Sequence, residues 1–411
     1  MTRRFRLKTL LLTSSSTMGL VLGGAAFAAD APEQVAQAAQ AAGTGQLEEV
    51  VVTAQKRSEN VQQVPIAVTA VTPATLQNIG ALKSDELALA VPGLQIQHEI
   101  DATTTFIRGV GPNSNGTGEE SSVAVYLDDL YIEQGDASIF SLNAISNIQV
   151  LKGPQGTLFG RNATGGVIQV QTEDPSFTPS IDAHIGYGNY DTKSGDVYVT
   201  GPIIPGILAA NLAAYSNDES EGWGRDVATG ERAFTSNDWA VRAKLLFTPT
   251  DTTRILVSLS HFYDRGEQGL GFNQVPQYIA AGAPGLIDGA TFVGWYNTED
   301  FMNDVSVIKH DLIEIRADQE TDFAKFVDIL GWQRMNGYAQ FAQDGSPAAL
   351  VDTRLNQKGR DWSNEFQVLN PGDAPYASWL TWIAGAYYLH DDSGYGNAFL
   401  RGAAFGFPVQ T

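Results

Sequence analysis

The residues of this chain that could carry out chemistry are mostly acidic, and they form no catalytic or metal-binding pattern. Five histidines are scattered along the sequence, and no two have the spacing of metal ligands: His98, His184, His261, His310 and His390. Cysteine is absent, which excludes disulfides, thiolate metal sites and a cysteine nucleophile. Neither a G-x-S-x-G nor an H-E-x-x-H motif occurs. We therefore predict that the chain is not an enzyme and that it holds no metal and no cofactor.

The most informative pattern is a glycine-rich run at residues 150–168, whose two ends are apolar and β-branched. Glycine reaches backbone angles that other residues avoid, so the run predicts a tight strand–loop–strand unit and not a helix. The spacing from Gly160 to Gly165 begins like a phosphate-binding loop, but Gly166 stands where that motif requires lysine. We therefore reject phosphate binding at this loop.

The bulk composition limits the class of protein. The chain has 411 residues, which allows two or more domains. With 25 Lys+Arg against 46 Asp+Glu, its net charge of -21 argues against nucleic acid as a partner, because phosphate binding needs a basic surface. Beyond the N-terminus, no apolar run reaches the roughly 20 residues of a membrane-spanning helix. If the chain crosses a membrane, it must do so as a β-barrel.

The N-terminus predicts an export signal followed by a tether. Residues 1–28 combine a basic start, an apolar stretch and Ala26-Phe27-Ala28 as a cleavage site, which is typical of a secretory signal peptide. The start partly resembles a twin-arginine signal, but Arg6 stands where that motif needs a bulky apolar residue, which favours the general secretory route. Residues 29–46 are rich in Ala and Gln and predict a flexible tether, because they cannot build a core.

Short strands and helices are expected between the tether and the glycine run. Segment 64–71 predicts a strand, and Thr72-Pro73 has the N-cap and first-turn chemistry of a helix start. Residues 84–90 predict a second short helix, which Pro92-Gly93 ends. Further strands are expected at 93–97, 106–111 and 123–129.

The order of these elements, ending in the glycine run, resembles the plug domain of TonB-dependent outer-membrane receptors over about residues 48–175. The resemblance implies an α+β plug domain at 47–175, followed by a transmembrane antiparallel β-barrel at 176–411. It also implies energy-coupled import of a scarce ligand, such as a ferric siderophore, in the cell outer membrane of a Gram-negative organism. The plug signature of the family falls on these positions: Arg108, Gly109, Lys152, Gly153, Pro154, Gly156, Gly160, Arg161, Gly165 and Gly166.

A segment directly after the tether resembles the TonB-coupling box of the family. It is first acidic and then apolar and β-prone: Glu48, Glu49, Val50, Val51, Val52, Thr53 and Ala54. An exposed, extended segment can add a strand to the sheet of a partner, here the energy-transducing protein TonB. An ordinary first strand of the plug is the alternative.

Residues 113–122 are polar and glycine-rich, and they suit a plug apex that faces the external ligand. The ligand-facing candidates are Asn113, Ser114 and Asn115. A plain solvent loop is the alternative, and the sequence alone does not separate the two.

The sequence departs from the family pattern where ion pairs usually join plug and barrel. Six positions differ from the family. The first four usually carry ionic residues, the fifth a Gly and the sixth an Asn: Ser146, Asn147, Gln149, Lys152, Asp129 and Gln169. Lysine is a poorer and less directional partner for a carboxylate than arginine. We therefore expect the ionic contacts to be weaker, or to run through Arg108 and Arg161.

The second half of the chain predicts membrane strands. Along 238–248, Trp239, Val241 and Leu245 share one face while Arg242 and Lys244 lie on the other, which is typical of a wall between lipid and lumen. Nine strands are expected, at 181–190, 194–200, 207–217, 237–248, 254–265, 305–317, 323–336, 358–369 and 379–390.

The connections between these strands alternate between short and long, as in outer-membrane barrels. The stretch 266–304 would be a long outer loop with aromatic side chains that could touch ligand; the alternative is that these aromatics pack the loop on itself. Nine strands are fewer than half of the family's number, which is about 22. Open edges in a bilayer would leave backbone groups unpaired, so we expect the sequence to be a truncated fragment.

Two other functions compete with import. A passive or adhesive outer-membrane barrel protein with a decayed plug would account for the lost ionic residues. A soluble β-rich binding module agrees less well with the apolar face of the strands. The sequence leaves the ligand open among siderophore, haem, vitamin B12 and oligosaccharide. TonB, outer-membrane lipid and a small ligand are the expected partners.

Overall fold

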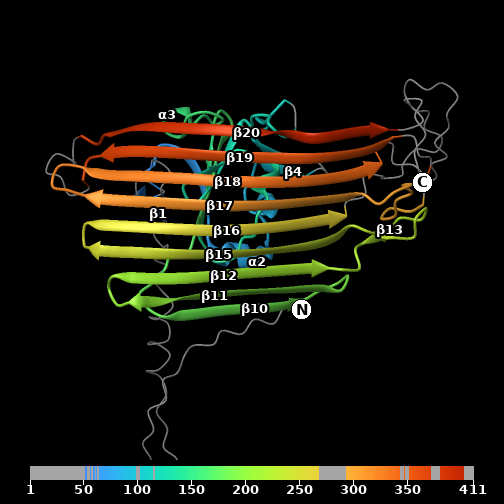
Figure 1. Cartoon of the computed structure of the whole chain (residues 1–411), viewed down its shortest axis with the longest axis horizontal. Helices are drawn as coiled ribbons and strands as arrows, with labels where there is room; N and C mark the ends of the chain where they lie inside the picture. The colour runs from blue at the N-terminus through green and yellow to red at the C-terminus, as the bar shows by residue number, and fades with distance from the viewer. Residues whose placement is uncertain are drawn as a thin grey trace, which may run out of the picture.

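The computed structural model describes residues 51–52, 56, 59–60, 62, 64–98, 102–113, 116–267, 293–342, 347, 351–371 and 380–401. A smaller domain, which we call the plug, lies against one face of a large sheet (Figure 1). The predicted signal peptide and tether lie outside the described residues. Within them, no helix is both long enough and apolar enough to cross a membrane.

The plug is built on a five-stranded sheet in the order β3-β8-β9-β6-β7, in which β6 and β9 run parallel and the other pairs antiparallel. Its strands are β3 (Ala67–Val71), β6 (Val123–Leu127), β7 (Leu130–Ile132), β8 (Ile145–Lys152) and β9 (Gly166–Thr172). Two short pairs accompany this sheet: β1 (Val51–Val52) with β2 (Glu59–Asn60), and β4 (Leu94–His98) with β5 (Thr103–Ile107).

The first helix of the plug, α2 (Pro73–Ile79), begins where the sequence predicts. The Oγ1 atom of Thr72 accepts a hydrogen bond from the Thr75 amide at 3.3 Å, and Pro73 occupies the first turn. Gly80 ends the helix in the left-handed conformation, with φ of 74°. Two 3₁₀ turns follow, η1 (Ser84–Leu89) and η2 (Asp136–Ser138).

A helical turn interrupts the glycine run, which corrects the prediction of a loop without helix. This turn, α3 (Gly156–Phe159), lies between β8 and β9. Phe159 is buried, and its ring centroid is 5.5 Å from that of Tyr126. The gain from burying the aromatic ring explains why the chain turns here.

The apolar core of the plug continues into the sheet that carries it. Ile148, Val150 and Val170 are fully buried at its centre. Phe262 and Met335 of the sheet belong to the same cluster, and the rings of Phe140 and Phe262 are 6.0 Å apart. Apolar contacts therefore join the two parts as well as polar ones.

The large sheet has nine antiparallel strands, each paired with its neighbours in sequence order, which confirms the predicted fold class and strand number. Most strands extend beyond the predicted ends, and β20 begins later than expected. The strands are β10 (Ser180–Tyr187), β11 (Thr192–Ile204), β12 (Leu208–Glu219), β15 (Thr235–Thr250), β16 (Thr253–Glu267), β17 (Val305–Glu320), β18 (Lys325–Ala342), β19 (Asp352–Leu369) and β20 (Ile383–Arg401).

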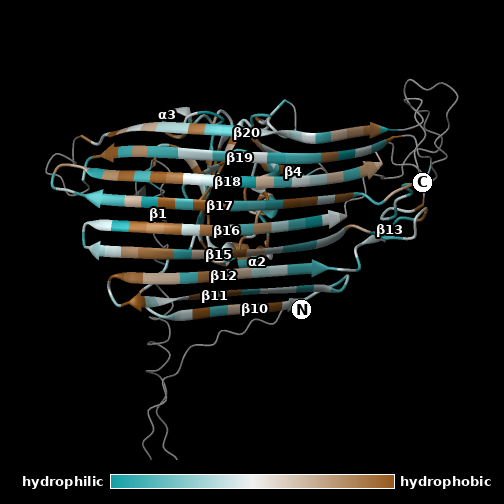
Figure 2. Ribbon diagram, in the orientation of Figure 1, coloured by the Kyte–Doolittle hydropathy of each residue, from teal (hydrophilic) through white to brown (hydrophobic). Residues whose placement is uncertain are grey.

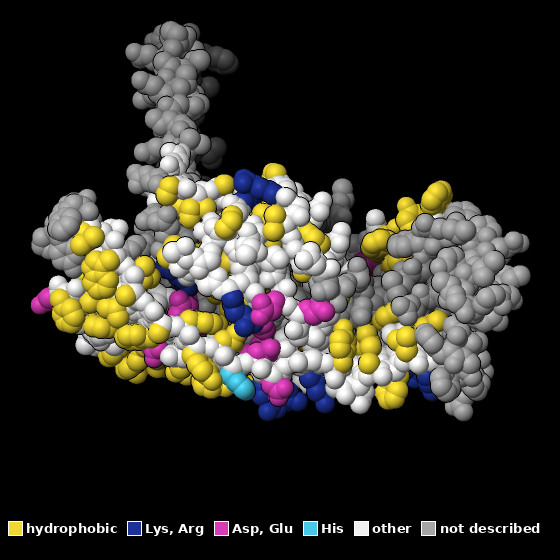
Figure 3. Space-filling model, turned by 90° about the horizontal axis from the view of Figure 1, so that it is seen from above, with side chains coloured by type: hydrophobic (Ala, Val, Ile, Leu, Met, Phe, Trp, Pro, Cys, Tyr) yellow, Lys and Arg dark blue, Asp and Glu magenta, His cyan; other side chains and the backbone are white. Residues whose placement is uncertain are grey.

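Side chains alternate across the sheet as the sequence predicts. On β15, Trp239 and Val241 are 39% and 40% exposed on the outer face, while Arg242 and Lys244 are only 3% exposed against the plug. Polar and apolar segments interleave along the strands (Figure 2). A view from above shows several patches of apolar side chains, with charged side chains between them (Figure 3). The sheet therefore presents an apolar outer face and a polar inner face.

The connections at the two rims of the sheet differ in length, with two exceptions: the short β10–β11 turn (188–191) lies at the rim of the long connections, and the longer β19–β20 connection (370–382), expected to be short, lies at the rim of the short turns. The short turns β11–β12, β15–β16 and β17–β18 share one rim, which we call the short-turn rim (Figure 1). The other, the long-loop rim, carries the connections β12–β15 and β16–β17, with a small ribbon of β13 (Gly224–Arg225) and β14 (Arg232–Ala233). Within the aromatic-rich connection, Trp295 and Tyr296 are exposed, and residues 268–292 lie outside the described residues.

Candidate functional site

Two glycines of the signature are required by the close approach of neighbouring backbones. A Cβ atom on Gly166 would lie 2.3 Å from the Leu151 carbonyl oxygen, and φ there is 150°. A Cβ atom on Gly165 would lie 3.0 Å from the Val110 carbonyl oxygen. The amide of Gly165 donates to the Ser122 carbonyl at 2.8 Å. These residues therefore hold the start of β9 against two other segments of the plug.

The rest of the glycine run forms the connection from β8 to β9. The amide of Gly153 donates to the Gly165 carbonyl at 3.0 Å, with φ of 105° at Gly153. Pro154 is exposed, Gly156 opens α3, and Gly160 ends it with φ of 72°. These glycines face open space and serve the local path of the chain.

Arg108, Gly109 and Lys152 lie around one turn of the plug. Arg108 and Gly109 have φ of 52° and 79°, and the Arg108 amide donates to the Gly93 carbonyl at 2.7 Å. The Nζ atom of Lys152 donates to the Pro92 carbonyl at 2.8 Å. Burial and the nearby charge of Arg108 lower the pKa of Lys152. Lys152 thus ties the end of β8 to this turn and not to the sheet.

Arg161 forms its ion pairs inside the plug. Its guanidinium contacts Glu133 and lies 3.4 Å from Glu120. Burial raises the pKa of Glu133, although the charge of Arg161 opposes the shift. The expectation that plug–sheet ion pairs run through Arg161 is therefore wrong.

The apex loop lies against β20. Asn113 is exposed, whereas Ser114 and Asn115 lie outside the described residues. A Cβ atom on Gly116 would lie 3.1 Å from the Tyr395 hydroxyl, and the Gly118 amide donates to the Gln134 side chain at 3.4 Å. The loop thus joins the plug to the half of β20 toward the long-loop rim.

The coupling segment is described only in part. Of residues 48–54, Val51 and Val52 are described, and they pair with Asn60 and Glu59 as β1 and β2. Lys56, just beyond, has its Nζ atom 3.1 Å from Glu365 on β19. The same ammonium lies over the rings of Tyr126 and Phe159, 5.6 and 5.2 Å from their centroids.

Adjacent carboxylates at the end of β6 bind cations of the sheet. Asp128 lies 3.1 Å from the Nζ atom of Lys244 and accepts a hydrogen bond from the Thr172 amide at 2.8 Å. Asp129 contacts the guanidinium of Arg316. Burial disfavours the charged form of Asp129, but the charge of Arg316 outweighs it and lowers the pKa of that carboxyl.

A further cation of the plug binds two carboxylates of the sheet. The Nζ atom of Lys83 is 2.7 Å from Asp264 and 3.1 Å from Asp238. Burial disfavours its charge, yet the two carboxylates raise the pKa of Lys83. No local sequence pattern identifies these partners, although Asp129 is unusual for the family. The ion pairs exist, but they connect other residues than those expected.

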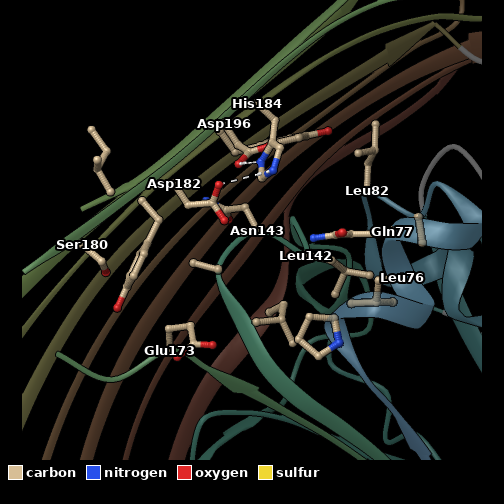
Figure 4. Close-up of a pocket in the computed structure, with 17 residues that line it drawn as sticks. Leu76, Gln77, Leu82, Leu142, Asn143, Glu173, Ser180, Asp182, His184 and Asp196 are labelled. Carbon is tan, nitrogen blue, oxygen red and sulfur yellow. Dashed lines mark hydrogen bonds and ion pairs between the residues drawn. The ribbon is translucent and has the colours of Figure 1, made fainter. Parts of the chain in front are cut away.

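A cavity of about 500 Å³ separates the plug from the first strands of the sheet (Figure 4). Leu76 and Gln77 of α2 line one side, and Asp182, His184 and Asp196 of β10 and β11 line the other. His184 lies 2.9 Å from Asp196 and 3.5 Å from Asp182. Among the described residues, no group of His, Asp and Glu has the arrangement of a metal site.

Comparisons with known proteins agree with this fold. Residues 60–167 match the family model described as the TonB-dependent receptor plug domain. The pesticin receptor of Yersinia pestis is 27% identical over 300 residues, which cover 69% of this chain and 43% of that receptor. The vitamin B12 transporter BtuB of Vibrio vulnificus is 25% identical over 182 residues, covering 42% of this chain and 28% of the transporter.

A solved structure shows the same arrangement of plug and strands. The ferric yersiniabactin uptake receptor FyuA from Yersinia pestis matches with a TM-score of 0.67 at 21% identity, over 82% of this chain and 50% of that receptor. The chain spans half or less of the length of each of these proteins. The plug match and the receptor relatives both indicate a TonB-dependent outer-membrane receptor, and the shared fold agrees with them.

Proposed function

We propose that this chain supplies the plug and part of the barrel of an outer-membrane receptor that imports a scarce ligand with energy from TonB. The observation that carries the proposal is a fully folded plug, held by buried ion pairs on the polar inner face of a sheet whose outer face is apolar. Such a plug closes a pore until work is done on it, which is what energy-coupled import requires. A signal peptide at residues 1–28 would direct the chain to the cell envelope.

A ferric siderophore is the ligand class that we propose. Support comes from the name of the solved relative, a ferric yersiniabactin uptake receptor, and the plug-plus-sheet fold is compatible with such a ligand. The vitamin B12 transporter among the relatives keeps a cobalamin as the second candidate. Asn113, Ser114 and Asn115 at the apex would contact the ligand, together with loops of the long-loop rim.

TonB is the proposed partner, and residues Glu48 to Ala54 are its proposed binding segment. The segment contains β1, which pairs with β2 over two residues. A two-residue strand is easily displaced, so that the segment could leave it and add to the edge of a partner sheet. Lys56 and Glu365 would mark the point where this segment joins the wall of the barrel.

Deletion of Glu48 to Ala54 in the complete receptor tests the proposal. We expect loss of energy-dependent uptake with unchanged ligand binding to cells, because the apex and loops are untouched. Uptake and binding of a ⁵⁵Fe-labelled siderophore would be measured in parallel. A deletion of equal length inside the tether, at residues 32–38, is the matched control. Normal uptake after the first deletion would contradict the proposal.

The rival function is a passive or adhesive barrel with a decayed plug. The buried core of the plug and its ion pairs to the sheet count against decay. The rival predicts that a protonophore leaves uptake unchanged, whereas the proposed import stops when the proton gradient collapses.

A further inference from the structure

Four basic residues interrupt the apolar outer face of the large sheet. Each is exposed, while the residues directly before and after it in the strand are buried, so all of them point away from the plug. We call them the basic patch: Lys309 on β17, Arg334 on β18, and Lys358 and Arg360 on β19. Because these strands are neighbours in the sheet, the patch is one continuous surface.

The register of the strands brings the four side chains together. Arg334 lies directly opposite Arg360. In the next row toward the long-loop rim, Asn336 lies between Lys309 and Lys358. Like charges that face each other directly on adjacent strands repel. An anion bound between the cations would remove this repulsion.

Carboxylates of the protein neutralise the basic patch only in part. Asp311 and Asp392 lie opposite the two arginines on the outer strands, but the Oδ1 atom of Asp311 is 2.6 Å from the Nδ1 atom of His261. Among the residues that the structure describes, no ion pair joins any of the four cations to a carboxylate. By contrast, Arg354 on the same face of β19 lies 3.1 Å from Asp352. The basic patch therefore keeps positive charge that is available to a ligand.

Aromatic side chains place the basic patch at the edge of the apolar band. Trp332 and Trp362 lie opposite each other in the row next to the two arginines, on the side of the short-turn rim. The Nζ atom of Lys309 is 5.8 Å from the ring centroid of Tyr263. Tryptophan and tyrosine gather where the acyl chains of a bilayer meet the headgroups. The four cations therefore lie at the level of the headgroups.

We propose that the basic patch binds the phosphate groups of a lipid of the outer leaflet. The long-loop rim of a membrane barrel faces the cell exterior, which places the basic patch in that leaflet. Arginine binds phosphate through two parallel hydrogen bonds and lysine as a point charge, so the arginine pair and the lysine pair each take one phosphate. The acyl chains lie along the exposed apolar side chains toward the short-turn rim, which include Ile313, Leu330 and Phe366.

This inference rests on the outer-membrane location in the proposed function, and it does not depend on the imported ligand or on TonB. Binding of lipid A to the complete receptor in a neutral detergent tests it. Lipid A carries a phosphate group at each end of its headgroup, and its monophosphoryl form has lost one of them. Native mass spectrometry measures the fraction of receptor that retains each lipid as the lipid concentration rises.

The test variant is Arg334→Gln/Arg360→Gln. The control variant, Lys193→Gln/Arg232→Gln, removes the same charge from two exposed ion pairs. Circular dichroism and the gel mobility of the unheated receptor check that both variants fold. If the test variant does not fold, Lys309→Gln/Lys358→Gln replaces it, with the same expected result.

We expect the native receptor and the control variant to bind lipid A alike, and the native receptor to bind the monophosphoryl form more weakly. The test variant should bind lipid A about tenfold more weakly, because the charged hydrogen bonds to one phosphate are lost. Equal affinity of the test variant and the native receptor for lipid A would overturn the site, and so would equal affinity of the native receptor for the two lipids. Displacement of lipid A by inorganic phosphate alone would reveal a site for a free anion and would overturn the lipid as its occupant.

The deletion of Glu48 to Ala54 separates this inference from the import function. The deleted receptor should bind lipid A like the native receptor, because the outer face of the sheet is unchanged. Normal uptake after the deletion contradicts import and leaves the lipid site intact. Equal lipid A affinity of the test variant and the native receptor contradicts only the lipid site.

Discussion

At the residue scale, two glycines of the glycine-rich run differ in whether they tolerate a side chain. Gly166→Ala would place a Cβ atom 2.3 Å from a backbone oxygen at a φ that L-residues avoid, whereas Gly156 opens α3 with free space around it. We expect Gly166→Ala to lower the free energy of unfolding of the plug by more than about 2 kcal/mol. Gly156→Ala should leave it unchanged or raise it by up to about 1 kcal/mol. Urea unfolding of the purified receptor checks both, and equal losses would contradict the steric argument.

The buried carboxylates of the plug should contribute more to the free energy of unfolding than the carboxylates on the surface. Asp128→Ala would leave the buried ammonium of Lys244 without one of its two carboxylate partners in the plug, and removing one member of a buried pair costs about 3–5 kcal/mol. Because Lys244 also lies near Asp174, the loss should fall at the lower end of that range. Glu221→Ala, in the exposed pair with Arg232, is the control and should cost less than about 1 kcal/mol. Similar losses for both variants in urea unfolding would argue that the buried pair does not hold the plug.

Asp129 makes the attachment of the plug sensitive to acid. Its pKa in the folded protein lies below the usual carboxyl value, which is about 3.9, because of Arg316. The unfolded chain therefore takes up the proton first, so the stabilisation is complete above about pH 4 and is lost as the pH falls further. We expect the stability difference between the native receptor and Asp129→Asn to be constant from pH 7 to 5 and to shrink below about pH 4. A difference that grows on acidification would refute this assignment.

How much of the site can be predicted depends on the distance between partners. The steric need for Gly165 and Gly166 is local, and the sequence pattern identifies it. The ion pairs join residues far apart in sequence, such as Lys83 and Asp264, which are separated by 181 positions, and no local pattern specifies such a pairing. Asp129 was marked only because it differs from the family pattern. Its partner Arg316 can be identified only once the arrangement of the strands around the plug is known.

At the element scale, the residue types at helix ends predict a helix better than the composition of the segment does. Helix α2 could be predicted because Thr72, Pro73 and Gly80 each favour one position at its ends. Helix α3 was missed because glycine disfavours helices, and the burial of Phe159 against Tyr126 outweighs that preference. Strand ends were predicted too short, since the backbone ladder continues through polar residues where the apolar alternation has stopped, as along the first residues of β19. The start of β20 was placed too early, and hydrogen bonds between Asn370 and Trp382 close that connection instead.

At the scale of the whole molecule, polarity is arranged in three layers. The outer face of the sheet is apolar, the inner face is polar, and the plug adds its own apolar core within. The inner layer carries the ion pairs to the plug on β15, β16, β17 and β19, and a cavity lined by Asp182, His184 and Asp196 lies at the first strands of the sheet.

The pair of Lys56 and Glu365 also bears on the order of assembly. These residues are 309 positions apart, and β19 is the eighth strand of the sheet. A ribosome completes the segment around Lys56 long before it makes Glu365, so during synthesis the ammonium has no partner on the wall. The ion pair between Lys56 and Glu365 can therefore form only after β19 has been synthesised. The segment around Lys56 is synthesised early, but its ion pair with the sheet is among the later contacts to form.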